Sequence, residues 1–151
     1  MRTLVRLLVL CALACTGLAQ AAPACSIALR SDGSMRYDLE RVAVSAACPS
    51  INVVLTHSGR LPVDAMGHNV VINTSADAVA VAQDGIRAGA AGGYIAAGDR
   101  RVVAATRKVG GAESARTSFP GKRLVPGADY VFFCSLPGHF PRMKGVLSVT
   151  R

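Results

Sequence analysis

Short stretches in which hydrophobic and polar residues alternate recur along this chain from residue 26 to its end. Most are rich in Val, Ile, Thr and aromatic residues, and turn-favouring runs such as SDGS at 31–34 and PGAD at 126–129 separate them. Alternation with a period of two is typical of β-strands that bury one face, and many short strands in one domain indicate two facing antiparallel sheets. The predicted strands are 26–31, 41–45, 51–57, 69–73, 101–108, 114–119, 129–134 and 145–150.

One segment, residues 74–98, breaks this alternation because alanine and glycine dominate it. Thr74 and Ser75 are suited to capping the start of a helix, and Gly85 or Gly89 to ending it. We therefore predict an all-β fold with a short helical insertion around residues 75–89, outside the sheets.

Residues 1–21 have a different pattern, which predicts a secretory signal peptide. Two arginines precede an apolar run over 7–14, and small residues follow at 19–21. A basic start, a short apolar stretch and a small-residue cleavage site are typical of such leaders, and the run is too short to span a membrane. We expect cleavage near Ala22. A lipid anchor at Cys15 is the alternative, which we disfavour because the leucine before it is misplaced for lipidation.

The length of the remaining chain, 22–151, limits the number of domains, and its charge indicates the kind of partner it can bind. About 130 residues suffice for one domain with a real core, but not for two. The whole chain has 17 basic and 9 acidic residues, a formal net charge of +8. Without the leader arginines this becomes about +6, which favours acidic partners. Aromatic residues do not interleave with the basic ones, and no further apolar run is long enough to span a bilayer, so we expect neither nucleic-acid binding nor stable membrane association.

Three cysteines, Cys25, Cys48 and Cys134, lie outside the predicted leader. An odd number leaves at least one unpaired, and in an oxidising compartment the simplest partition is a disulfide between Cys25 and Cys48. Cys134 is then a free thiol. Taken alone, a spare thiol or an intermolecular disulfide is the more ordinary role of such a cysteine.

Cys134 is not alone, because an imidazole at His139 and a thioether at Met143 follow it within ten residues. A turn containing Pro and Gly between two strands can direct all three side chains to one centre. A second imidazole is offered by His68, beside an upstream strand. Two histidines, one cysteine and a distant methionine form the ligand set of blue-copper electron-transfer sites. The sequence therefore predicts a site for one copper ion that cycles between Cu(II) and Cu(I).

Two other kinds of site use similar residues. A cysteine–histidine nucleophile, as in cysteine proteases, requires an orienting Asn or Asp and an oxyanion hole, and it leaves Met143 and His68 without roles. Structural zinc is usually held by four Cys or His ligands, and this set offers three. We therefore favour copper and expect no enzymatic activity.

Motifs along the whole of 22–151 are similar to those of the azurins, periplasmic blue-copper proteins of the cupredoxin family. They are Cys25-Ser26-Ile27, Leu61-Pro62, Met66-Gly67-His68-Asn69, Phe132-Phe133-Cys134, Pro137-Gly138-His139 and Met143-Lys144-Gly145. The resemblance implies an eight-stranded Greek-key β-sandwich with a helical flap, and it agrees with the expected disulfide. We expect a monomer.

The resemblance also implies how copper is held. His68, Cys134 and His139 would form a triangle around the ion, with the Met143 sulfur and the Gly67 carbonyl as weak axial contacts. Glycine at position 67 has a physical reason as well, because a side chain there would obstruct close approach of the backbone to the metal.

Further residues are implied to support the site and to meet partners. Asn69 would brace the ligand loops, and the Leu136 amide would hydrogen-bond the Cys134 sulfur, contacts that tune the potential. An exposed edge of His139 would lie within an apolar patch that docks redox partners. Arg142 departs from the family, which usually has an apolar residue there, and adds a charge at the rim. The patch positions are Met35, Leu61, Met66, Ile86, Leu136, Pro137, Phe140 and Pro141.

The function expected from these patterns is that of a periplasmic electron carrier, which passes single electrons through the edge of His139. The alternative is a copper-binding or copper-delivery protein in which redox cycling is incidental. His57 matches a buried histidine of the family, and we expect it to be a hydrogen-bonded core residue without a role in transfer.

Overall fold

The computed structural model describes residues 24–151, so the predicted signal peptide, its cleavage site and Cys15 lie outside the described residues. Within that range the eight predicted strands are all present. The strands are β1 (Ser26–Ser31), β2 (Arg41–Ser45), β3 (Ile51–His57), β4 (Val71–Thr74), β5 (Ala104–Ala105), β6 (Ser114–Phe119), β7 (Tyr130–Phe133) and β8 (Lys144–Thr150). The helical elements are α1 (Val63–Met66), η1 (Ser75–Asp77), α2 (Ala78–Ala88) and η2 (Gly121–Arg123).

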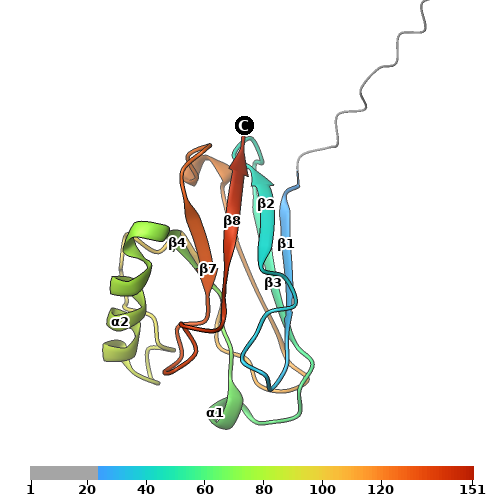
Figure 1. Ribbon diagram of the computed structural model, residues 1–151, viewed down its shortest axis with the longest axis vertical. Helices are drawn as coiled ribbons and strands as arrows, with labels where there is room; N and C mark the ends of the chain where they lie inside the picture. The colour runs from blue at the N-terminus through green and yellow to red at the C-terminus, as the bar shows by residue number, and fades with distance from the viewer. Residues whose placement is uncertain (1–23) are drawn as a thin grey trace, which may run out of the picture.

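The strands form two sheets that pack into a sandwich (Figure 1). The smaller sheet has the order β1-β3-β6 and the larger the order β2-β8-β7-β4-β5, which confirms the eight-stranded fold class. The expectation of antiparallel pairing throughout is wrong, because β1 pairs with β3, and β2 with β8, in parallel. The cause is a crossover: β2 belongs to the opposite sheet, so β3 returns beside β1 in the same direction.

The core lies between the two sheets and follows from the alternation seen in the sequence. Ile27 and Leu29 of β1, and Val53 of β3, point inward and are at most 1% exposed, while their neighbours in β1 face solvent. Phe132 and Leu147 close the core from the larger sheet. A period of two therefore places one face of each strand in this core.

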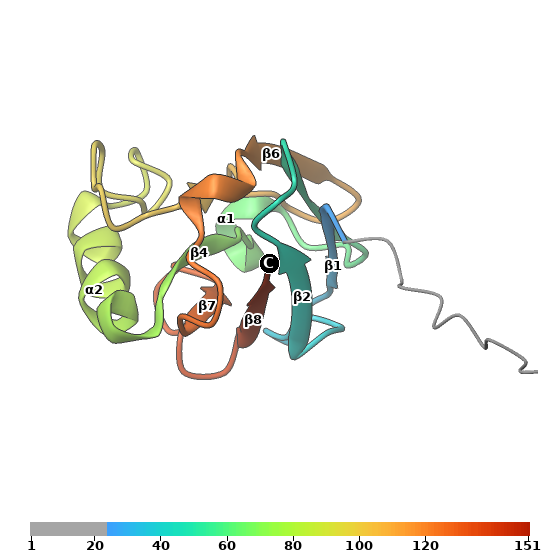
Figure 2. The same cartoon turned by 90° about the horizontal axis from the view of Figure 1, so that it is seen from above.

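The predicted helical insertion is present as η1 and α2, which lie beside β4 and outside the sandwich (Figures 1 and 2). The Thr74 hydroxyl accepts a hydrogen bond from an amide at the start, and Gly89, with φ of +71°, ends the helix. Gly85 lies within the helix rather than at its end, at a position where a Cβ would lie 2.3 Å from the Tyr94 carbonyl oxygen. Among residues 24–151, no helix has the length and apolar character needed to cross a bilayer.

The largest differences from the prediction concern β4, β5 and α1, while β7 and β8 differ by at most a single residue at either end. β4 begins at Val71 rather than residue 69, and β5 contains only Ala104–Ala105 of the predicted 101–108. The chain before β5 instead bends toward α2, where Arg101 binds acidic residues. α1 was not predicted, since four residues are too few for a helical period to show.

The disulfide between Cys25 and Cys48 is present, with a Cα–Cα distance of 5.6 Å. It joins the residue before β1 to the turn between β2 and β3. Cys134 is the free cysteine of the described residues, and it is buried. The structure therefore confirms the expected disulfide between Cys25 and Cys48 and the expected free thiol at Cys134.

Candidate metal centre

The predicted donors from two distant parts of the chain meet inside one end of the sandwich. One ligand atom from each of His68, Cys134 and His139 lies within 4.8 Å of the others. The two Nδ1 atoms are 3.3 Å apart, and the Cys134 Sγ is 3.4 Å from the Nδ1 of His139. His68, Cys134 and Met143 are 0% exposed and His139 is 8% exposed. The donors thus form a buried cluster with one member at the surface.

The loop between β7 and β8 positions three of these residues through its own backbone. The Cys134 N–H donates to the Met143 carbonyl at 3.0 Å, and the Met143 N–H donates to the His139 carbonyl at 2.8 Å. The His139 N–H donates to Leu136, while Gly138 adopts φ of +78°, a conformation that favours glycine. Because the paired ends of β7 and β8 anchor this loop, Cys134 and Met143 lie opposite each other.

His68 is held from the other side by a two-way backbone pair with Val109. The His68 N–H donates to the Val109 carbonyl at 2.9 Å, and the Val109 N–H donates to the His68 carbonyl at 2.8 Å. Gly67 precedes it where space is tight, because a Cβ at position 67 would lie 2.3 Å from the Val63 carbonyl oxygen. The packing of α1 therefore gives a second reason for glycine here.

The hydrogen bond of His68 fixes which of its nitrogens is free. Its Nε2 lies 2.7 Å from the backbone carbonyl oxygen of Asp32, and a carbonyl can only accept, so Nε2 carries the proton. Nδ1 then presents a lone pair toward the cluster. Burial lowers the pKa of His68 to about 4, so the ring is neutral near pH 7. A neutral imidazole with an oriented lone pair is what a metal ligand requires.

The Cys134 sulfur is suited to a soft cation. Burial raises the pKa of its thiol to about 11, and backbone hydrogen bonds from Asn69 and Leu136 oppose that shift. A bound cation stabilises the thiolate and displaces the proton. A buried thiolate, two imidazoles and an enclosed thioether fit copper, whose two oxidation states accept soft and borderline ligands.

Asn69 joins the two ligand segments. Its Oδ1 accepts the Ser135 N–H at 2.9 Å, and its Nδ2 donates to the Ser135 Oγ at 2.9 Å. Asn69 is 0% exposed and directly follows His68, while Ser135 directly follows Cys134. The spacing between the two ligands is thus held by side-chain hydrogen bonds.

His57 has a complete set of hydrogen bonds in the core. Its Nδ1 accepts the Gly59 N–H at 3.0 Å, and its Nε2 lies 2.9 Å from the Met66 carbonyl oxygen, to which it donates. Its ring stacks on that of His68 with centroids 4.7 Å apart. This is the arrangement of the hydrogen-bonded core residue that we expected.

The residues of the predicted docking patch differ in exposure. Leu61 and Ile86 are each 48% exposed, Pro137 and Pro141 are exposed, and Met35 and Met66 are half-buried. Leu136 is 7% exposed, about as little as His139 at 8%, and both line the same surface depression, so only an edge of its side chain is accessible. Phe140 is half-buried against Phe133, with ring centroids 5.0 Å apart.

Sequence reasoning missed several residues that hold the ligands, among them Asp32, Val109 and Ser135. Asp32 and Val109 act through backbone atoms, which any residue type supplies. Ser135 acts through its amide and hydroxyl, and its partner is 66 positions away. Only Ser135, as a polar residue next to the predicted ligand Cys134, carried any signal in the sequence.

Comparison with known families agrees with this donor set. The profile of a family described as "Copper binding proteins, plastocyanin/azurin family" matches residues 24–150. The chain belongs to this family. Among its plastocyanin/azurin relatives, the azurin of Alcaligenes faecalis is 41% identical over 126 residues, which cover 83% of this chain and 98% of the relative. The azurin of Bordetella pertussis is 44% identical over 125 residues, covering 83% of each protein.

A solved azurin structure has the same fold as this family member. The azurin Az-iso2 of Methylomonas sp. strain J superposes with a TM-score of 0.80 at 37% identity, covering 84% of this chain and 98% of the other. The azurin resemblance inferred from the motifs is therefore confirmed, as is copper as the cofactor. The azurin relatives also support a role in blue-copper electron transfer.

Proposed function

We propose that this plastocyanin/azurin family member is a periplasmic carrier that accepts and donates single electrons through the edge of His139. Copper would be held by His68, Cys134 and His139, with the Met143 sulfur and the Gly67 carbonyl as weaker contacts. The bound ion supplies a one-electron Cu(II)/Cu(I) couple. The observation that carries the proposal is a buried set of soft and borderline donors of which one reaches the surface.

The rigidity of the donors supports a carrier. Hydrogen bonds from Val109 and Asp32 fix His68, and the loop's own bonds fix Cys134 and His139. Ligands held this firmly keep one arrangement for both oxidation states, so little energy is spent on reorganising them. Low reorganisation favours fast transfer rather than chemistry on a bound substrate.

The orientation of His139 supports the route. Its Nδ1 faces Cys134 and His68, so its opposite edge points away from the cluster. His139 also lines a surface depression with Pro137 and Lys108. Exposed apolar residues nearby in the sequence, such as Pro141, suit a surface that docks partners briefly. Electrons would enter and leave across this surface, to and from redox partner proteins.

Several further properties belong to the proposal. The leader predicted at residues 1–21 supports secretion to the periplasm. The enclosed donors support a role other than that of an enzyme, because a substrate would need an open position beside the ion. We also propose a monomer that binds neither nucleic acid nor membranes stably.

The decisive measurement is the visible spectrum of the purified protein with Cu(II). We expect an intense thiolate-to-copper absorption in the red part of the spectrum that disappears reversibly on one-electron reduction. Cys134→Ser should abolish it while leaving the far-ultraviolet circular dichroism unchanged. A colourless copper-loaded protein would refute the proposal.

The alternative function, copper delivery, differs from electron transfer in how firmly the protein retains its copper. His68, Cys134 and Met143 are 0% exposed, which supports retention over release. The reduced protein should therefore lose its copper to a competing Cu(I) chelator far more slowly than it exchanges electrons. Rapid loss of copper through many redox cycles would favour delivery.

A further inference from the structure

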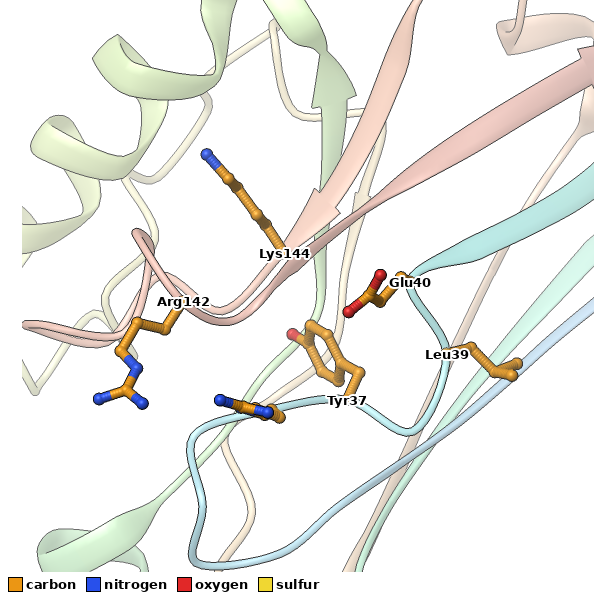
Figure 3. A pocket seen from close by; sticks show the side chains of 6 residues that line it. Tyr37, Leu39, Glu40, Arg142 and Lys144 are labelled. Carbon is orange, nitrogen blue, oxygen red and sulfur yellow. The ribbon is translucent and has the colours of Figure 1, made fainter.

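We propose that a basic cavity beside the ligand loop is a docking socket for carboxylate side chains of an acidic redox partner. The cavity lies between the loop that precedes β8 and the segment between β1 and β2, and its volume is 290 Å³ (Figure 3). The inference rests on the proposed function, since it names the class of protein with which this carrier exchanges electrons. The lining residues are Arg36, Tyr37, Leu39, Glu40, Arg142 and Lys144.

The cavity has an excess of positive charge that is not neutralised. Arg36 and Arg142 stand against the single carboxylate of Glu40, while Lys144 lines the cavity with its stem and holds its ammonium over the Phe140 ring, 5.2 Å from the ring centroid. In the described part of the chain, none of the three cations has a carboxylate oxygen within 4.0 Å, whereas Arg101 has two such acidic partners. Unpaired cations around a concavity focus the field and attract anionic groups.

The two arginines are attached to segments that hold the copper donors. The Arg142 N–H donates to the His139 carbonyl at 3.0 Å, within the ligand loop. Arg36 precedes Tyr37, whose buried hydroxyl donates to the carbonyl of Asn69. In Figure 3, Tyr37 projects from its segment toward the loop that carries Arg142. The backbones of both cations are therefore placed by the same contacts that order the donors, which reduces the entropy lost on binding.

The position suits electron transfer, because Arg142 follows His139 by three residues and is hydrogen-bonded to it. An apolar groove of 440 Å³ adjoins the cavity, sharing Glu40 and Lys144 and lined also by Phe140 and Val79. Val79 is 56% exposed. A partner with carboxylates beside an apolar patch would satisfy both surfaces and contact the loop that carries His139.

A protein partner fits better than an anionic membrane. The site is concave, and Glu40 stands in its wall, where it would repel a uniform layer of lipid phosphates. A protein can place individual carboxylates near the cations and avoid Glu40. The net positive charge of the chain adds long-range attraction to an acidic protein.

The test uses hexaglutamate as the probe and the ¹⁵N-labelled Cu(I) protein, followed by amide NMR at low ionic strength. We expect saturable shifts centred on Arg36, Tyr37 and Arg142. Arg36→Gln and Arg142→Gln should each weaken binding roughly two- to fivefold. The matched control is Lys122→Gln, an exposed cation in η2 beside the disulfide, which should leave binding unchanged.

Three outcomes would overturn the inference. Equal shifts at all surface arginines, or equal weakening by Lys122→Gln, would show that hexaglutamate responds to the net charge of the protein and not to this cavity. Binding to phosphatidylglycerol vesicles that requires Arg36 and Arg142, with none to hexaglutamate, would reassign the socket to a membrane. Since the NMR titration needs no electron transfer, its failure is distinct from a colourless protein, which would refute the carrier function alone.

Discussion

Arg101 and Asp99 form a two-point ion pair: Nε lies 2.9 Å from one carboxylate oxygen, and a terminal guanidinium nitrogen lies 2.7 Å from the other. The same guanidinium also contacts Asp84 of α2. Arg101 thereby ties the segment before β5 to the helix. Hydrogen bonds from Arg101 are the main cause that holds the pKa of each carboxyl, Asp84 and Asp99, below its usual value of 3.8.

This network predicts a loss of stability in acid. A carboxyl whose pKa is lowered by folding stabilises the native state above its unfolded pKa of 3.8, and that contribution disappears as pH falls through the lowered folded value. Thermal unfolding midpoints should therefore fall more steeply below pH 4 in the native protein than in Arg101→Met. Arg100→Met, at an exposed neighbour, serves as the control. Parallel pH profiles for Arg101→Met and the native protein would contradict the prediction.

Tyr37→Phe should destabilise the protein by about 1–3 kcal/mol, because it leaves the buried Asn69 carbonyl without its side-chain donor. Denaturant unfolding measures the change. Tyr94→Phe, at a half-buried position, is the matched control and should cost less. If the two variants were equally stable, the hydrogen bond to Asn69 would have no net effect.

Asn69→Ala should weaken copper binding by about 10- to 100-fold, since it removes the side-chain hydrogen bonds to Ser135 that fix the distance between ligand segments. Competition with a chelator measures the affinity, and the red absorption reports any change at the sulfur. Asn52→Ala, on the exposed face of β3, should leave both unchanged. An unchanged affinity in Asn69→Ala would show that the loops hold the site without it.

Gly67→Ala should disturb the site, because its Cβ would lie 2.3 Å from the Val63 carbonyl oxygen and the backbone before His68 must move. We expect a cost of about 1–3 kcal/mol and an altered visible spectrum. Gly33→Ala provides the control, since a Cβ there meets nothing within 4 Å. A normal spectrum in Gly67→Ala would mean that α1 yields without displacing His68.

Replacing Cys25 and Cys48 together with serine should lower the free energy of unfolding by about 3 kcal/mol, since the unfolded chain loses the constraint of a closed loop. The copper spectrum should persist because Cys134 is separate. Urea unfolding measures the loss of stability, and visible absorption measures whether the copper spectrum persists. Loss of the spectrum in a folded double variant would show that the disulfide shapes the site.

Much of the fold was visible in the sequence where alternation is strong. The predicted bounds of β1, β2, β3 and β6 agree with the structure, because each has one buried face. β5 was overestimated because Arg101 draws its predicted first half toward α2, a tertiary contact that no local pattern shows. The parallel pairing of β1 with β3 was missed for a similar reason, since it depends on which sheet receives β2.

The donors were predictable because copper requires particular side chains, and Cys134 and His139 stand close together in the sequence. Their supports were less visible. His68 is oriented by the backbone carbonyl of Asp32, and because any residue type has such a carbonyl, the sequence does not show this contact.

The three cysteines of residues 24–151 lie at opposite ends of the sandwich. Cys25 and Cys48 lie at the end of the sandwich where the C-terminus lies, whereas Cys134 follows β7 at the opposite end (Figure 1). Once the chain is folded, the Cys134 thiol is 0% exposed and is shielded from oxidants and from exchange with other thiols. The folded protein can therefore keep the Cys134 thiol available for a metal in an oxidising compartment while Cys25 and Cys48 stay paired.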